Sequence, residues 1–142
     1  MELAIAAARE AARAGEVPVG AVVMRDGAVV ATARNETEAT HDPTAHAEIL
    51  AIRRAAAALG DTRLSECDLY VTLEPCAMCA AAISHARIRR VVFGAYDPKG
   101  GAVEHGPRWF QQSTCLHRPE VLGGVGEAES AALLKDFFAT RR

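Results

Sequence analysis

The stretch DLYVTLEPCAMCAAAISHAR, residues 68–87, carries two secondary-structure signals that meet at one proline. Its first six residues are mostly apolar and include β-branched side chains, which predicts a strand. Pro75 is tolerated in the first turn of a helix, and the Ala-rich segment after it predicts a helix over residues 76–87. Cys76 and Cys79 are three positions apart in that first turn, so they share one helix face. The sequence therefore places two thiols where a strand passes into a helix.

The segments on both sides continue this alternation of strands and helices. Apolar periodicity and turn residues predict a helix over 1–14, strands over 17–24 and 28–35, a helix from Asp42 and Pro43 to Gly60, strands over 89–96 and 120–125, and a final helix over 127–142. This order predicts an α/β fold with one mixed, five-stranded sheet covered by helices, in a single domain over residues 1–142. The irregular residues 97–119 between strands four and five are too many for a hairpin, which favours a parallel pairing of these two strands.

A second chemical motif lies in PTAHAEIL, residues 43–50, at the predicted start of the preceding helix. His46 and Glu48 are two positions apart, and at about 100° per residue they point to nearly opposite sides of a helix. Side chains in a first turn tilt toward the helix N-terminus, however, so both groups reach the space beyond the helix end. Two helix starts thus offer an imidazole, a carboxylate and two thiols.

These groups match the needs of a catalytic zinc site. Structural zinc takes four protein ligands, whereas catalytic zinc takes three and leaves one position for water. His46, Cys76 and Cys79 supply three, and no fourth ligand lies nearby in the sequence. Zinc lowers the pKa of a bound water to about 7, and Glu48 would be the base that takes a proton from this water and hands it to a leaving amine.

Each group also has a simpler interpretation. A single His near a helix start caps the helix or faces solvent, an acid in the first turn favours the helix dipole, and a CxxC pair after a strand is typical of thioredoxin-like redox sites. A non-enzymatic zinc or thiol-redox module is therefore a competing hypothesis. Glu48 discriminates against it, because a structural zinc site has no use for a base. Cys67 and Cys115 have no ligand-spaced partner, and His85, His105 and His117 do not lie at a helix start, so we expect no metal at these residues.

Composition limits the classes of function. The chain has 142 residues and a formal net charge of −2, which gives no overall attraction to nucleic acid. No apolar run is long enough to span a bilayer, and residues 1–15 lack the basic and continuous apolar regions of a signal peptide. We therefore expect a cytoplasmic protein with reduced thiols and no membrane partner, in which any contact with nucleic acid rests on a local basic patch.

The motifs HAE, residues 46–48, and PCAMC, residues 75–79, together form the signature of zinc deaminases. With EVPVGAVV, HDPTAHAEI, LYVTLEPCAMCAAAI, ARIRRVVFGA and the closing ALLKDFF, the chain resembles bacterial tRNA-specific adenosine deaminases over residues 17–142. The resemblance implies a three-layer α/β/α cytidine deaminase-like fold and hydrolytic deamination of adenosine to inosine at the tRNA wobble position. It also implies one Zn²⁺ per subunit, a homodimer, and a tRNA anticodon stem-loop as partner.

The resemblance further implies a set of substrate-binding residues. Asn35 corresponds to an asparagine that orients the target nucleoside, and the Ala47 backbone would meet the purine. Val17 and Leu73 would form the apolar walls of the pocket. The DPK loop, residues 97–99, and the C-terminal helix would contact flanking nucleotides through Asp97, Lys99, Phe138, Arg141 and Arg142.

The chain departs from the common family pattern after Lys99, where it reads GGAVEHGPRWF, residues 100–110. The loop keeps its length but not its side chains, which leaves its tRNA contacts open. We expect Glu74 to support the cysteine turn by hydrogen bonding and to take no part in the chemistry. A deaminase for a free base or nucleoside, such as guanine, cytosine or adenosine, is the alternative on the same scaffold. The DPK loop and the C-terminal segment argue against it, because a small substrate needs neither.

Overall fold

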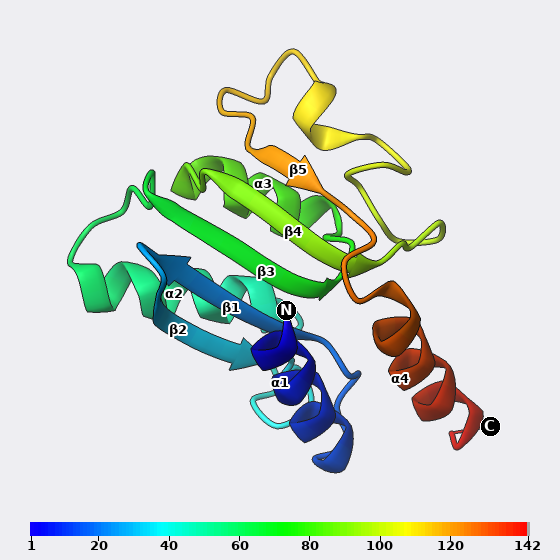
Figure 1. Cartoon of the computed structure of the whole chain (residues 1–142). Helices are drawn as coiled ribbons and strands as arrows, with labels where there is room; N and C mark the ends of the chain where they lie inside the picture. Colours follow the sequence, from blue (N-terminus) through cyan, green and yellow to red (C-terminus); the bar gives the residue numbers. More distant parts are fainter. Residues whose placement is uncertain (142) are drawn as a thin grey trace.

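The structure, a computed structural model, describes residues 1–141 and is built around one five-stranded sheet (Figure 1). The strands are β1 (Gly20–Arg25), β2 (Ala28–Arg34), β3 (Cys67–Leu73), β4 (Arg90–Ala95) and β5 (Glu120–Leu122), in the order β2-β1-β3-β4-β5. β1 is antiparallel to β2 and β3, whereas β3 is parallel to β4 and β4 to β5. The predicted mixed sheet with parallel fourth and fifth strands is therefore confirmed.

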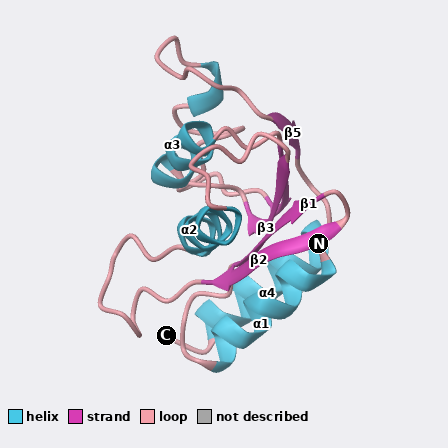
Figure 2. Cartoon of the chain, turned by 90° about the vertical axis from the view of Figure 1, so that its left-hand side faces the viewer, coloured by secondary structure: helices cyan, strands magenta, loops and turns pink. Residues whose placement is uncertain are grey.

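Helices cover both faces of this sheet (Figure 2). α1 (Glu2–Arg13) and α4 (Glu127–Ala139) lie on one face, and α2 (Ala47–Leu59) and α3 (Ala77–Ala86) on the other. A short 3₁₀ helix, η1 (Trp109–Gln111), contacts α3. The predicted three-layer α/β/α architecture is confirmed. Within residues 1–141, every helix is too short or too polar to cross a membrane.

The strand directions bring two helix starts together. β2 and β3 are both antiparallel to β1, so they run in the same direction and end at the same edge of the sheet. α2 follows β2 and α3 follows β3, and both helices therefore begin at that edge. Leu69, Val71 and Phe93 have no solvent exposure and anchor the central strands between the two helical layers.

Both helices begin later than their sequence signals predict. The Asp42 carboxylate accepts hydrogen bonds from the N–H and the hydroxyl of Thr44, so it closes a local turn instead of capping α2, which begins after His46. α3 likewise begins after Cys76. The fifth strand is shorter than predicted, since Gly124 takes a φ of 83°, which ends an extended backbone.

Candidate active site

His46 and Cys76 occupy equivalent positions, as the N-caps of α2 and α3. Both have extended backbones, and neither side chain caps its own helix, so both can point past the helix ends. Glu48 is the second residue of α2 and Cys79 the third of α3, and all four residues meet in one space. The dipoles of the two helices that begin here make this space favourable for negative charge.

The three predicted metal ligands have the spacing of a tetrahedral site. His46 Nδ1 lies 3.7 Å from Cys76 Sγ and 3.5 Å from Cys79 Sγ, and the three ligand atoms all lie within 4.8 Å of one another. A tetrahedral zinc ion with ordinary bond lengths separates its nitrogen and sulfur ligands by about 3.5 Å. Within residues 1–141, no other three His, Cys, Asp or Glu side chains come together in this way. One imidazole and two thiols at this spacing fit zinc.

Burial and mutual contacts set the charge of these groups. Burial raises the pKa of Glu48 to about 7, because its carboxylate has almost no access to water. A hydrogen bond from Cys79, helped by one from His46, outweighs burial and lowers the pKa of Cys76 to about 4. The same bond to Cys76 raises the pKa of Cys79. The hydrogen bond between them thus favours the thiolate at Cys76 and the thiol at Cys79, and a bound dication would favour the loss of both protons.

We call the three predicted ligands His46, Cys76 and Cys79 the metal-ligand set, and a cavity of about 280 Å³ opens beside it. Its walls contain the predicted residues Val17, Asn35, His46, Glu48, Leu73, Cys76 and Asp97. They also contain four residues that the sequence did not indicate as cavity-lining: Val19, Thr37, Glu74 and Gly100. Gly100 belongs to the divergent loop and Glu74 is next to the PCAMC motif, but Val19 and Thr37 carry no motif that could have pointed to them.

A wider groove of about 920 Å³ continues from this cavity, since the two share Val17, Leu73, Asp97 and Gly100. The groove is lined in addition by Tyr96, Lys99, Leu134, Phe138 and Arg141. Three of these residues, on the DPK loop and at the C-terminal end, are predicted substrate contacts. Arg142, which is also a predicted contact, lies outside the described residues.

Asn35 connects the start of α2 to the cavity. Its Oδ1 accepts a hydrogen bond of 2.8 Å from the Ala47 N–H, and this leaves the Nδ2 group as the donor that can face a ligand. Ala47 is fully buried and is not part of the cavity wall. The Ala47 N–H is therefore committed to Asn35, and the contact of the Ala47 backbone with a purine stays a prediction.

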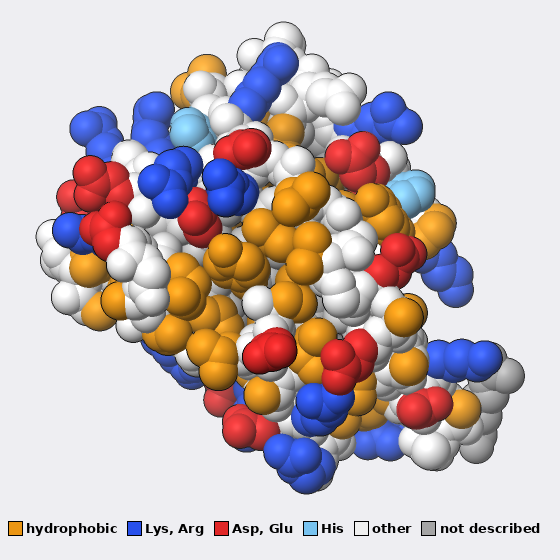
Figure 3. Space-filling model, in the orientation of Figure 1, with side chains coloured by type: hydrophobic (Ala, Val, Ile, Leu, Met, Phe, Trp, Pro, Cys, Tyr) orange, Lys and Arg blue, Asp and Glu red, His pale blue; other side chains and the backbone are white. Residues whose placement is uncertain are grey.

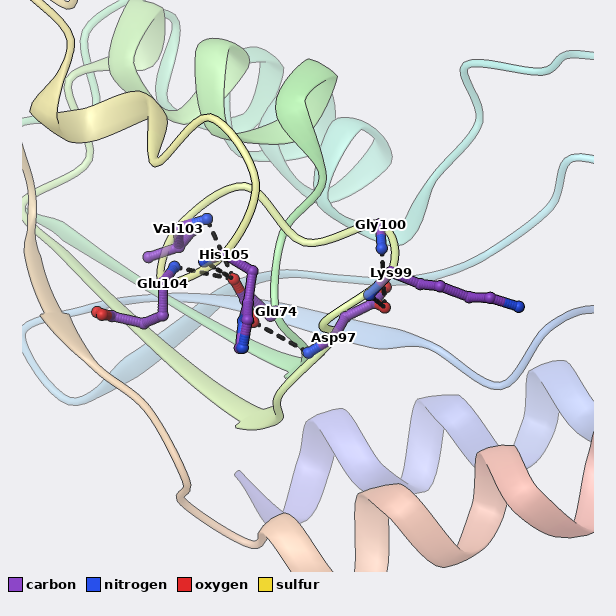
Figure 4. Close-up of polar contacts among 7 residues, drawn as sticks. All are labelled: Glu74, Asp97, Lys99, Gly100, Val103, Glu104 and His105. Atoms are coloured by element: carbon purple, nitrogen blue, oxygen red, sulfur yellow. Dashed lines mark hydrogen bonds and ion pairs between the residues drawn. The ribbon is translucent and has the colours of Figure 1, made fainter.

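Glu74 has a different partner from the one predicted. Its buried carboxylate binds the loop over residues 97–105, not the cysteine turn (Figure 4). Burial alone would raise the pKa of Glu74, but hydrogen bonds from the Asp97 and Glu104 N–H groups and from His105 outweigh it and lower the pKa. The sequence could not indicate these partners, because they lie 23 to 31 positions away along the chain.

Comparison with known proteins agrees with this geometry. The MafB19-like deaminase family matches residues 1–142. A tRNA-specific adenosine deaminase of Agrobacterium fabrum is 58% identical over 142 residues, which cover 100% of this chain and 93% of that protein. The chain belongs to the bacterial tRNA-specific adenosine deaminases. The resemblance seen in the sequence is thereby confirmed, and this chain is an enzyme of the hydrolase class.

Two solved structures extend the comparison. The deaminase is 60% identical to a chain from a biochemical and structural study of A-to-I editing by tRNA:A34 deaminases, with a TM-score of 0.93, over 94% of this chain and 97% of that one. It is 43% identical to a guanine deaminase from Bacillus subtilis, with a TM-score of 0.64, over 67% of this chain and 61% of that one. The scaffold is thus shared with an enzyme named for a free base.

Proposed function

We propose that this deaminase hydrolyses adenosine to inosine at the wobble position of tRNA. One observation carries the proposal: the cavity beside His46, Cys76 and Cys79 opens into a groove more than large enough for flanking nucleotides. A free base or nucleoside would use the cavity alone. The relatives named for tRNA adenosine deamination support the same substrate.

The proposed site holds one zinc ion on His46 Nδ1 and the sulfurs of Cys76 and Cys79. When bound, zinc supplies a water whose pKa falls to about 7. Glu48 would take a proton from this water and would hand a proton to the leaving amine, so that the water oxygen replaces the amine at C6 and the amine leaves as ammonia. A buried carboxylate with a pKa near neutrality suits both steps, because it can accept and donate a proton at similar cost.

The cavity and the groove divide the work of binding. We assign Asn35 Nδ2 to orienting the target base and the side chains of Val17 and Leu73 to its apolar walls. An adenine must leave its stack to expose C6, and anticodon loops offer bases that unstack at low cost. Phe138, half of whose surface is exposed, offers a ring to a neighbouring base, and Arg141 stacks on Phe137 at 3.9 Å.

Few cations are available to hold RNA phosphates. On the face shown in Figure 3, Lys and Arg side chains are interspersed with Asp and Glu around an apolar area, and no continuous basic surface covers it. Lys99 and Arg141 are the cationic side chains among the residues that line the groove. Each phosphate contact on a single strand contributes about 0.7 to the salt slope, so we propose moderate salt dependence and recognition chiefly by loop shape.

We expect an anticodon stem-loop with adenosine at the wobble position to be converted to inosine about 10²-fold faster than free adenosine at equal concentration. Only the stem-loop is large enough to make contacts in the groove, so free adenosine lacks the contribution of these contacts to catalysis. Nucleoside mass analysis measures both products. Faster turnover of free adenosine, guanine or cytidine would overturn the tRNA proposal in favour of the free-base alternative.

A pair of variants tests the groove in the same assay. Arg141→Ala should lower kcat/KM for the stem-loop, because it removes one phosphate contact. Arg118→Ala, an exposed arginine outside the groove lining, is the matched control and should behave like wild type. Equal rates for both variants would remove the proposed role of the C-terminal end and leave the zinc chemistry standing.

Assembly and location complete the proposal. We propose a symmetric homodimer, as the family resemblance implies; α3 and the segment after it, CAAAISHARIRR, would present small side chains and then arginines to a partner. Light scattering at micromolar concentration should give the mass of two chains, and a monomer mass would contradict the dimer.

We propose the cytoplasm as the location of this deaminase, because tRNA is available there, and cell fractionation tests this.

A further inference from the structure

One buried carboxylate ties the loop over residues 97–105 to the turn that carries a metal ligand. Glu74 directly follows β3 and lies two positions before Cys76, and its side chain has no solvent exposure. Five donors of the loop converge on it at 2.8–3.2 Å: the N–H groups of Asp97, Val103, Glu104 and His105, and His105 Nδ1 (Figure 4). A carboxylate has about four lone-pair sites, so Glu74 has no acceptor left for a substrate.

The loop that Glu74 holds is a wall of the substrate site. Asp97 and Gly100 line both the cavity and the groove, and Lys99 lines the groove. The Asp97 side chain in turn accepts hydrogen bonds from the N–H groups of Lys99 and Gly100, at 3.2 and 3.0 Å. Glu74 thus holds the backbone of Asp97. The Asp97 side chain in turn holds Lys99, the residue that brings a cation to the groove.

Gly101 is adapted to this carboxylate. A Cβ at this position would lie 2.6 Å from Cδ and Oε2 of Glu74 and 2.5 Å from the Asp97 carbonyl oxygen, closer than carbon can approach. Any side chain would therefore push the loop away from Glu74. Two separate features thus fasten the loop to Glu74: the carboxylate, whose acceptor sites are all used, and the close approach of Gly101. We call this attachment of the loop to Glu74 the anchor.

We infer that Glu74 is a positioning residue that sets the distance between the metal-ligand turn and the substrate wall formed by residues 97–100. It acts on the binding of the substrate and not on proton transfer or metal binding. The inference rests on the proposed function only for the choice of substrate. Loss of the anchor should therefore raise KM while kcat and the zinc content stay unchanged.

The test compares Glu74→Gln with wild type on the anticodon stem-loop. Glutamine keeps the shape but places an NH₂ group among N–H donors, so it cannot accept all of their hydrogen bonds. We expect KM to rise about tenfold, the loss typical of hydrogen bonds to a charged group, with kcat within about twofold. Zinc should remain at one ion per chain. Amide hydrogen exchange at residues 97 and 103–105 should accelerate about tenfold.

Matched variants separate positioning from folding. Glu104→Gln makes the same charge change on an exposed side chain of the same loop and should retain the wild-type KM. Gly101→Ala keeps the Glu74 carboxylate but displaces the loop, so it should reproduce the rise in KM. Glu74→Asp keeps the charge on a shorter side chain and should recover part of the loss. If Glu74→Gln does not fold, KM, kcat and zinc content are measured for Gly101→Ala and Glu74→Asp instead, and the same changes support or contradict the inference.

Several outcomes would overturn the inference. An unchanged KM in Glu74→Gln and Gly101→Ala would do so, and so would loss of zinc or a fall in kcat at constant KM, which would place Glu74 in the metal site or the chemistry. If the wild-type protein forms no inosine, the proposed function fails and hydrogen exchange decides alone. Unchanged exchange rates in Glu74→Gln then overturn the anchor, and faster rates support it.

Discussion

Glu48→Gln should abolish nearly all turnover of the anticodon stem-loop while the protein keeps its fold and its zinc. The amide has the size of the carboxylate but cannot take a proton from water or return one to the leaving amine. General acid–base catalysis contributes about 10²–10⁴-fold, and Glu48 is proposed to serve in both transfers, so we expect a loss at the upper end of this range. Single-turnover formation of inosine measures the rate, and elemental analysis measures the zinc.

The matched control for this change is Glu66→Gln, an exposed carboxylate just before β3, at the end of that strand away from the site. It should retain wild-type turnover. Activity close to wild type in Glu48→Gln would mean that the base has been assigned to the wrong residue. Loss of zinc together with activity would instead make Glu48 part of the metal site.

Removal of zinc should cost all measurable activity, and its return should restore it. Metal-replete protein should contain about one zinc per chain, held by three protein ligands, with one position left for water. Cys79→Ser should lose most of this zinc and with it the turnover, because an alcohol is a far weaker ligand than a thiolate. Elemental analysis and inosine formation, measured on the same preparation, test both parts.

Cys115→Ser controls for the loss of a buried thiol. Cys115 donates to the His117 carbonyl oxygen at 3.2 Å, a bond that serine can keep, and it lies outside the metal-ligand set. This variant should retain zinc and activity. A protein that is active without zinc, and that forms a Cys76–Cys79 disulfide on oxidation, would favour the thiol-redox hypothesis. A fourth protein ligand on the metal would contradict a catalytic site.

Local signals in the sequence predicted which strands and helices form better than they predicted where each one begins and ends. β-Branched runs and the Ala-rich segments located the strands and helices, because periodicity and propensity act within one element. Asp42 misled the start of α2, since an Asp before Pro suits a turn as well as a cap, and the hydrogen bonds to Thr44 favour the turn. The helix instead begins at Ala47 with His46 as its N-cap, and at this position the imidazole does not cap its own helix.

The sequence by itself determined which ligand types are present and that both sets lie at helix starts, because capping positions and ligand spacing are local properties of the chain. Only the tertiary structure decided that the two starts face each other, since this depends on β2 and β3 both pairing with β1. It also decided that α4 lines the groove and that Glu74 serves a loop 23 to 31 positions away. Contacts between distant segments depend on how the layers pack, and no local pattern of residues records that.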